Sequence, residues 1–141
     1  MGRILALDIG RKRIGVAVTD PAGIIAQGLT TVPAHELWDF LEEYTGREEV
    51  DEFVVGYPVT LHNEPSEALR WINPVIKRLR KLYPQKKITQ VDERFTSALA
   101  QQAMLAGGVK KEKRKDKALV DKVSATIILQ GYMEQSKNSE R

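Results

Sequence analysis

The stretch Arg3–Thr19, RILALDIGRKRIGVAVT, decides the fold because it holds two apolar strands joined by a basic turn. Residues 3–8 read as a buried strand, residues 10–15 as a tight turn, and residues 14–19 as a strand in which Ile14, Val16 and Val18 alternate along the chain. The turn signal at residues 21–23 and a third strand over residues 24–32 follow. The chain therefore opens with a three-stranded antiparallel meander.

The rest of the chain alternates helices and strands. A helical apolar period over residues 35–44 ends at Gly46, and a second helix covers about residues 64–82, where Pro74 must kink or divide it. Strands are expected at residues 52–56 and 88–91, and further helices at residues 96–105 and 119–135. This order predicts an α/β protein with an RNase H-like fold: a mixed five-stranded sheet flanked by helices, with the first strand central.

Composition narrows the class of protein. The 141 residues, 42% of them hydrophobic, suit one domain over residues 1–135 with a flexible tail at residues 136–141. The absence of cysteine excludes disulfides, thiolate zinc sites and cysteine nucleophiles, and two histidines, His35 and His62, cannot build a histidine-rich metal site. No apolar run approaches the ~20 residues of a membrane span. We expect a soluble, cytoplasmic protein with no membrane partner.

Three acidic segments lie inside or at the edge of apolar runs: Asp8, Asp92-Glu93 and Asp121. A carboxylate in such a place costs free energy to desolvate unless a cation or hydrogen-bond donors offset it. Three of them suggest a shared divalent metal ion. Because neighbouring residues of a strand point to opposite faces, one of Asp92 and Glu93 faces Asp8, and we choose Glu93 as the ligand, with Asp92 or Arg94 as support.

Each acid also has an ordinary explanation when taken alone. Asp8 could accept hydrogen bonds from the turn at Gly10, Asp92 could pair with Arg94 on the surface, and Asp121 could favour a helix N-terminus through the helix dipole. The metal-site prediction depends on the three acidic segments occurring together in one chain. An all-oxygen ligand set without histidine favours Mg²⁺ or Mn²⁺.

Positive charge is concentrated beside Asp121. The net charge of +3 permits a polyanionic partner without requiring one, but residues 110–117 hold six cationic side chains against Glu112 and Asp116. We predict that cationic side chains contact a nucleic-acid backbone; the alternative is a solvated loop. The candidate substrate-binding residues are Arg11, Arg13, Arg94, Lys113, Arg114 and Lys115.

Four motifs occur in order: LDIG at residues 7–10 continuing to residue 20, VGYP at 55–58, DERFTS at 92–97 and VDKVSA at 120–125. Together they resemble the YqgF, or RuvX-like, family of Holliday-junction resolvases, also described as nucleases of pre-16S rRNA, over nearly the whole chain. The resemblance implies an RNase H-like fold and metal-dependent phosphodiester cleavage, with the acidic residues of the family falling on Asp8, Glu93 and Asp121. Four positions depart from the family pattern: Arg11, Tyr57, Ser97 and Ser124.

The resulting hypothesis is a nuclease that processes the 5′ end of pre-16S rRNA in ribosome biogenesis, or resolves Holliday junctions in DNA. Two Mg²⁺ ions ~4 Å apart would be bridged by Asp8 and completed by Glu93 and Asp121. One alternative is a non-catalytic RNA-binding ribosome-assembly factor. Another is an actin- or sugar-kinase-like nucleotide binder, for which the chain is too short. RNA or DNA as substrate, endo- or exonucleolytic cleavage, and a homodimer on the substrate stay open.

Overall fold

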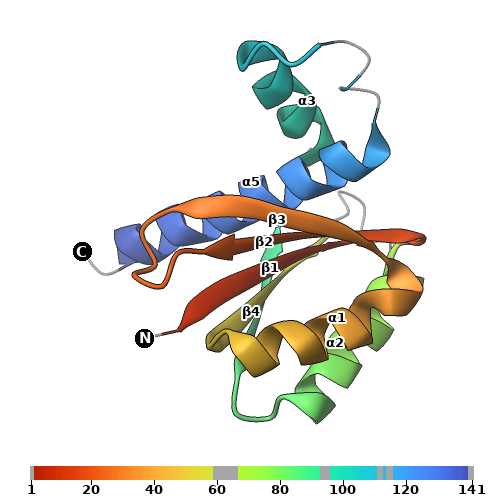
Figure 1. Ribbon diagram of the computed structural model, residues 1–141, viewed down its shortest axis with the longest axis vertical. Helices are drawn as coiled ribbons and strands as arrows, with labels where there is room; N and C mark the ends of the chain where they lie inside the picture. The colour runs from red at the N-terminus through yellow and green to blue at the C-terminus, as the bar shows by residue number, and fades with distance from the viewer. Residues whose placement is uncertain (1, 59–66, 93–95, 111–112, 114–115, 140–141) are drawn as a thin grey trace.

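Five strands form one mixed sheet in the order β3-β2-β1-β4-β5 in the computed structural model, which describes residues 2–58, 67–92, 96–110, 113 and 116–139 (Figure 1). Strand β1 pairs antiparallel with β2 and parallel with β4, β2 pairs antiparallel with β3, and β4 pairs parallel with β5. The strands are β1 Arg3–Ile9, β2 Arg13–Thr19, β3 Ala26–Pro33, β4 Val50–Tyr57 and β5 Lys87–Asp92. The mixed sheet with a central first strand confirms the predicted topology.

Helices cover both faces of the sheet. Figure 1 shows α1 and α2 together under one face, α5 crossing the other, and α3 beside the first turns of α5, away from the sheet. The helical elements are η1 Ala34–Glu36, α1 Leu37–Arg47, α2 Leu69–Leu82, α3 Thr96–Ala106 and α5 Lys117–Ser139. Within the described ranges, none of these helices is both long and apolar enough to cross a membrane.

The two faces of the sheet carry different side chains. Large residues such as Leu5, Leu7 and Phe53 pack towards α1 and α2. Towards α5 the sheet presents smaller residues, among them Ala6 and Ala17. Because side chains alternate along a strand, Asp8 lies on the same face as Ala6, under α5. The small residues on this face allow the helix to approach the sheet closely.

The far half of α5 is held by a polar cluster. The Tyr132 hydroxyl donates a hydrogen bond to Glu52 Oε2 at 2.5 Å, and Thr89 Oγ1 donates to the same oxygen at 2.7 Å. Burial raises the pKa of the Tyr132 hydroxyl above its ordinary value, and the bond to Glu52 adds to the effect. This cluster ties α5 to β4 and β5, far along the helix from Asp121.

Several element ends differ from the sequence prediction. The turn is shorter than residues 10–15, because Gly10 N donates to Arg13 O at 2.9 Å and β2 already begins at Arg13. Helix α1 runs past Gly46, and α2 continues from Leu69 to Leu82 with the exposed Pro74 inside it, so Pro74 does not divide the helix. Helix α5 continues to Ser139, so the expected flexible tail is helical up to that residue.

Ser124 places a hydroxyl inside the apolar layer between α5 and the sheet. Its side chain is buried, and its Oγ has no hydrogen-bond partner among the described residues. An unsatisfied buried hydroxyl costs about 1–3 kcal/mol, and serine also has a lower helix propensity than alanine. Ser124 therefore lowers the stability of the fold.

We expect Ser124→Ala to raise the free energy of unfolding by about 1 kcal/mol, because it removes the unsatisfied hydroxyl without leaving a sizeable cavity. Urea unfolding followed by circular dichroism measures the change. Thr126→Val is the control, since it removes a hydroxyl that donates to Lys122 O at 2.9 Å, and it should give no such gain. A loss of stability in Ser124→Ala would contradict the assignment.

Candidate active site

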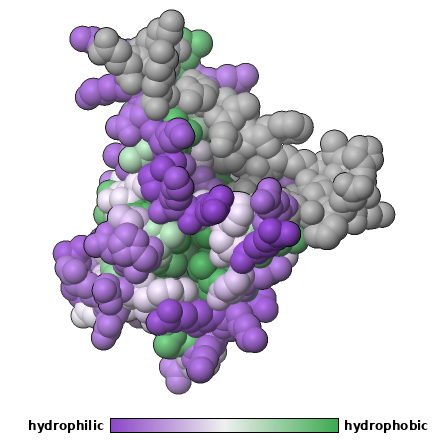
Figure 2. Space-filling model, turned by 90° about the vertical axis from the view of Figure 1, so that its right-hand side faces the viewer, coloured by the Kyte–Doolittle hydropathy of each residue, from purple (hydrophilic) through white to green (hydrophobic). Residues whose placement is uncertain are grey.

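Asp8 lies near the end of the central strand. It is half-buried and stands directly opposite Gly15 of β2 in the antiparallel ladder. The side-chain alternation of β1 turns it towards α5. Figure 2 views the molecule from the side on which the β1–β2 turn lies in Figure 1, and hydrophilic side chains surround a smaller hydrophobic area there.

Gly15 brings Asp121 to this end of the sheet. A Cβ atom on Gly15 would overlap the carbonyl oxygen and carbon of Asp121, so the backbone of α5 rests directly on β2 at this position. A glycine inside a strand is typical of such a close backbone approach. Because Gly15 pairs with Asp8, the contact places two of the three predicted acids at the same end of the same face.

The first turns of α5 also contact the edge strand. A Cβ atom on Gly28 would lie 2.8 Å from Lys122 Cγ. The Thr31 hydroxyl donates to the carbonyl oxygen of Ala118 at 2.5 Å. The N-terminal part of α5 is therefore fixed against both β2 and β3, and the position of Asp121 does not depend on its own side chain.

Arg13 pairs with Asp121 across the sheet–helix interface. Arg13 Nε donates to Asp121 Oδ2 at 3.0 Å, with the two side chains 37% and 24% exposed. Burial nevertheless holds the pKa of the Asp121 carboxyl above its ordinary value. The hydrogen bond from Arg13 and the positive charge of Arg13 lower this pKa, but they do not outweigh desolvation, and repulsion from Asp116 raises it further. The ionised carboxylate is thus incompletely compensated by the protein's own charges.

A cation fits this pair of acids. Asp8 and Asp121 offer hard oxygen donors, which Mg²⁺ and Mn²⁺ prefer, and the raised pKa of Asp121 means that added positive charge would stabilise its ionised form. Across the described residues, no three histidine or acidic side chains are grouped closely enough to hold a metal. The third predicted ligand, Glu93, lies outside the described residues, as does Arg94.

The other predicted residues are placed as follows. Asp92 is exposed at the end of β5, where it pairs in the ladder with Tyr57, whereas Val91 lies on the α5 face. Arg11 is exposed in the turn after β1, and Lys113 is exposed before α5. Arg114 and Lys115 lie outside the described residues. Their role as substrate-binding residues stays a prediction.

Two features of the site were missed by the sequence analysis. Gly15 was placed where the expected turn and strand overlap, and its close contact with α5 was not foreseen, although a glycine flanked by apolar residues of a strand is a signal for close packing. Arg13 was assigned to substrate binding, which stays a prediction, and its pairing with Asp121 was not foreseen. The second pairing joins residues 108 positions apart, which no local pattern predicts.

The fold places the protein in the RNase H-like class. A solved structure of Thermus thermophilus RuvC in complex with a Holliday junction substrate aligns with a TM-score of 0.60 at 12% identity, covering 98% of this chain and 97% of that one. Another Thermus thermophilus RuvC structure gives a TM-score of 0.56 at 13% identity, with 96% of each chain covered. At these identities the likeness concerns the fold alone.

The sequence comparisons identify the family. A model of the RuvX family, described as Holliday junction resolvase, matches residues 2–135, so the chain belongs to the RuvX family, as the motifs predicted. A relative from Phocaeicola vulgatus is 56% identical over 137 residues, which cover 97% of this chain and 99% of the relative. One from Flavobacterium johnsoniae is 47% identical over 133 residues, covering 94% and 96%. Both carry the provisional name pre-16S rRNA nuclease.

We expect Gly15→Ala to lower the free energy of unfolding by about 2 kcal/mol or more, because the new methyl group overlaps backbone atoms of α5 that cannot move independently. Urea unfolding measures the loss. The matched control is Gly131→Ala in helix α5, where an added Cβ would meet no described atom within 4 Å. It should stabilise the protein by about 0.5–1 kcal/mol through helix propensity. Equal effects of the two substitutions would contradict the close contact at Gly15.

The raised pKa of Asp121 predicts a pH dependence in metal-free protein. The folded state binds this proton more tightly than the unfolded state, so the contribution of the group to stability is lost as pH rises from 3.8 through the folded pKa. The unfolding free energy of Asp121→Asn minus that of wild type should therefore increase over this window and then level off. Urea unfolding with EDTA between about pH 3 and 7 tests this, and a difference independent of pH would contradict it.

Proposed function

We propose that this protein is a metal-dependent nuclease that hydrolyses phosphodiester bonds in the 5′ region of pre-16S rRNA during ribosome biogenesis. The observation that supports it most is the juxtaposition of Asp8 and Asp121 through Gly15, within a chain of the RuvX family. The provisional name of the relatives supports the rRNA precursor as substrate.

Each residue of the site has a proposed task. Asp8, Glu93 and Asp121 would hold Mg²⁺ or Mn²⁺, which when bound supplies charge neutralisation at the phosphate and an activated water. Arg13 orients the carboxylate of Asp121 through its 3.0 Å hydrogen bond and partly offsets its charge. Arg11 and the cationic residues before α5 contact the nucleic-acid backbone, which gives affinity without reading sequence.

A second candidate substrate is the four-way DNA junction, which the description of the family model favours. Cutting a junction symmetrically requires two active sites, so this activity would require a homodimer on the substrate. Cleavage of both substrates by the same preparation, together with its mass in solution and on the junction, separates the two candidates. We propose the cytoplasm as the location, since rRNA precursors and chromosomal junctions occur there in bacteria.

We expect Asp8→Asn to reduce cleavage at least about 100-fold, because losing a metal-binding charge removes several kcal/mol of transition-state stabilisation. Binding to the precursor RNA should persist, since side-chain volume and the basic residues are unchanged. Cleavage is measured with Mg²⁺ and binding by fluorescence anisotropy with Ca²⁺. Glu93→Gln and Asp121→Asn should behave in the same way, whereas Asp92→Asn is the control that should retain cleavage.

The same variants separate the nuclease from a non-catalytic assembly factor. Metal should raise the melting temperature of wild type and Asp92→Asn more than that of the other three variants, because a ligand that binds only the folded state stabilises it. Near wild-type cleavage by Asp8→Asn, or an equal metal-induced shift in all variants, would refute the site. Tight RNA binding by wild type with no cleavage under any metal would favour the assembly factor.

A further inference from the structure

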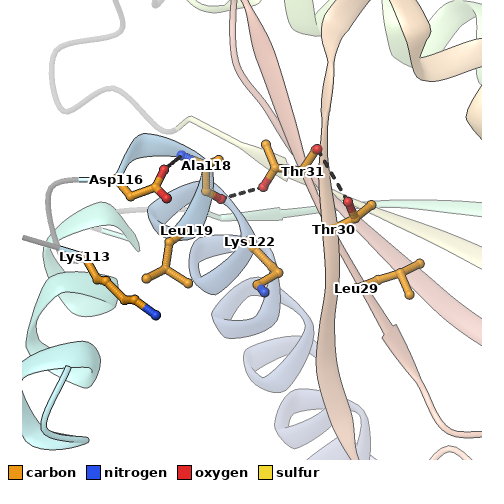
Figure 3. Close-up of a pocket in the computed structure, with 8 residues that line it drawn as sticks. All are labelled: Leu29, Thr30, Thr31, Lys113, Asp116, Ala118, Leu119 and Lys122. Carbon is orange, nitrogen blue, oxygen red and sulfur yellow. Dashed lines mark hydrogen bonds between the residues drawn. The ribbon is translucent and has the colours of Figure 1, made fainter. Parts of the chain in front are cut away.

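A surface cavity of about 400 Å³ lies between the edge strand β3 and the start of α5. Figure 3 shows β3 contributing one wall and the helical residues the other, with the side chains of Lys113 and Lys122 on the helical side. The lining residues are Leu29, Thr30, Thr31, Lys113, Asp116, Ala118, Leu119 and Lys122. The sequence analysis assigned Lys113, but not Lys122, to substrate binding.

The cavity is adjacent to the candidate active site without being part of it. Thr31 pairs with Gly15, and Gly15 pairs with Asp8, so Thr31 in the cavity wall and Asp8 lie at the same level of the sheet, two strands apart. Two strand spacings correspond to about 10 Å. On the helix side, Lys122 directly follows Asp121. The cavity therefore lies on the β3 side of α5, close enough to Asp8 and Asp121 for a phosphate neighbouring the one that is cut.

The described residues give the cavity a net positive charge, because Lys113 and Lys122 outnumber Asp116. No carboxylate in the part of the chain that the structure describes forms an ion pair with Lys113 or Lys122. Lys122 is half-buried, and its aliphatic stem lies against Gly28, where a Cβ would be 2.8 Å from Lys122 Cγ. This packing restricts the stem of Lys122, so ordering its ammonium group on a ligand costs less side-chain entropy than for a freely exposed lysine.

The other polar groups of the cavity supply no further donor side chain among the described residues. The Thr31 hydroxyl already donates to Ala118 O at 2.5 Å, and Thr30 pairs with Val16, whose side chain lies on the α1 and α2 face of the sheet. The charge of Asp116 opposes an anion. Its Oδ1 accepts a hydrogen bond from Ala118 N at 3.0 Å, so it acts as the N-cap of α5.

We propose that this cavity binds a phosphodiester of the substrate strand next to the one that is cut, with Lys122 and Lys113 as its donors. The inference rests on the proposed nuclease function and adds a subsite to it. None of the described lining residues is aromatic, so they offer no surface on which a base could stack. The subsite positions the strand and does not read its sequence.

The first test removes the charge of Lys122 while keeping its stem, in the Asp8→Asn background so that no cleavage occurs. Lys122→Met should weaken binding of the precursor RNA about eightfold at 0.1 M salt and lower the slope of log affinity against log salt by about 1. Lys122→Arg should restore both. Lys77→Met, on the exposed side of α2 across the sheet, is the matched control and should change neither.

Asp116 provides a test of opposite sign. Asp116→Asn keeps an effective N-cap and removes the opposing charge, so it should strengthen binding severalfold. A purely structural role of the cavity predicts no strengthening. Melting temperatures of all variants, measured without RNA, separate loss of binding from loss of folding.

A third measurement locates the phosphate. Single neutral methylphosphonate linkages are placed in turn at positions around the cleaved bond. At one neighbouring linkage, neutralisation should weaken binding to the protein with Lys122 but not to Lys122→Met, which is the coupling expected for a direct contact. Unchanged affinity and salt slope in Lys122→Met, while its parent binds RNA, would overturn the subsite alone. Absence of RNA binding and cleavage in wild type would instead overturn the proposed function.

Discussion

The contact between the backbone of α5 and Gly15 of β2 is the constraint on which the candidate site depends. Asp8 and Asp121 come from opposite ends of the chain, and neither long side chains nor a local motif brings them together. The absence of a single Cβ atom allows the helix to lie against the strand beside Asp8. Because packed backbones cannot adjust independently, the relative position of the two acids is set by the fold before any ligand binds.

This arrangement costs stability in the metal-free protein. Burial raises the pKa of Asp121 although Arg13 is bound to it. One turn further along α5, the Ser124 hydroxyl is buried with no hydrogen-bond partner in the part of the chain that the structure describes. Both are destabilising groups on the helix that carries the site. A site whose charges are incompletely compensated without its ligand is typical of proteins that trade stability for function.

Local patterns predicted the strands, their order and the place of Asp8, because alternation, turn residues and apolar runs are determined by neighbours in sequence. The pairing of Arg13 with Asp121 could not be predicted, because it depends on where α5 crosses the sheet. The close contact at Gly15 was open to prediction, because a glycine within an apolar strand indicates a close backbone approach. The role of Glu93 stays a prediction from the motif and from strand alternation.

Helix α5 is fixed to the sheet at two points. One is the backbone contact at Gly15, and the other is the hydrogen-bonded cluster of Tyr132, Glu52 and Thr89. Asp121 and Tyr132 are eleven residues apart, which corresponds to about 16 Å along the helix axis. One residue inserted or deleted between them would rotate Tyr132 by about 100° about the helix axis relative to Asp121. Exposed side chains along this span can therefore be substituted, whereas buried ones such as Ala125 and Leu129 are constrained by packing. The number of residues cannot change without separating the active-site acid from its sheet.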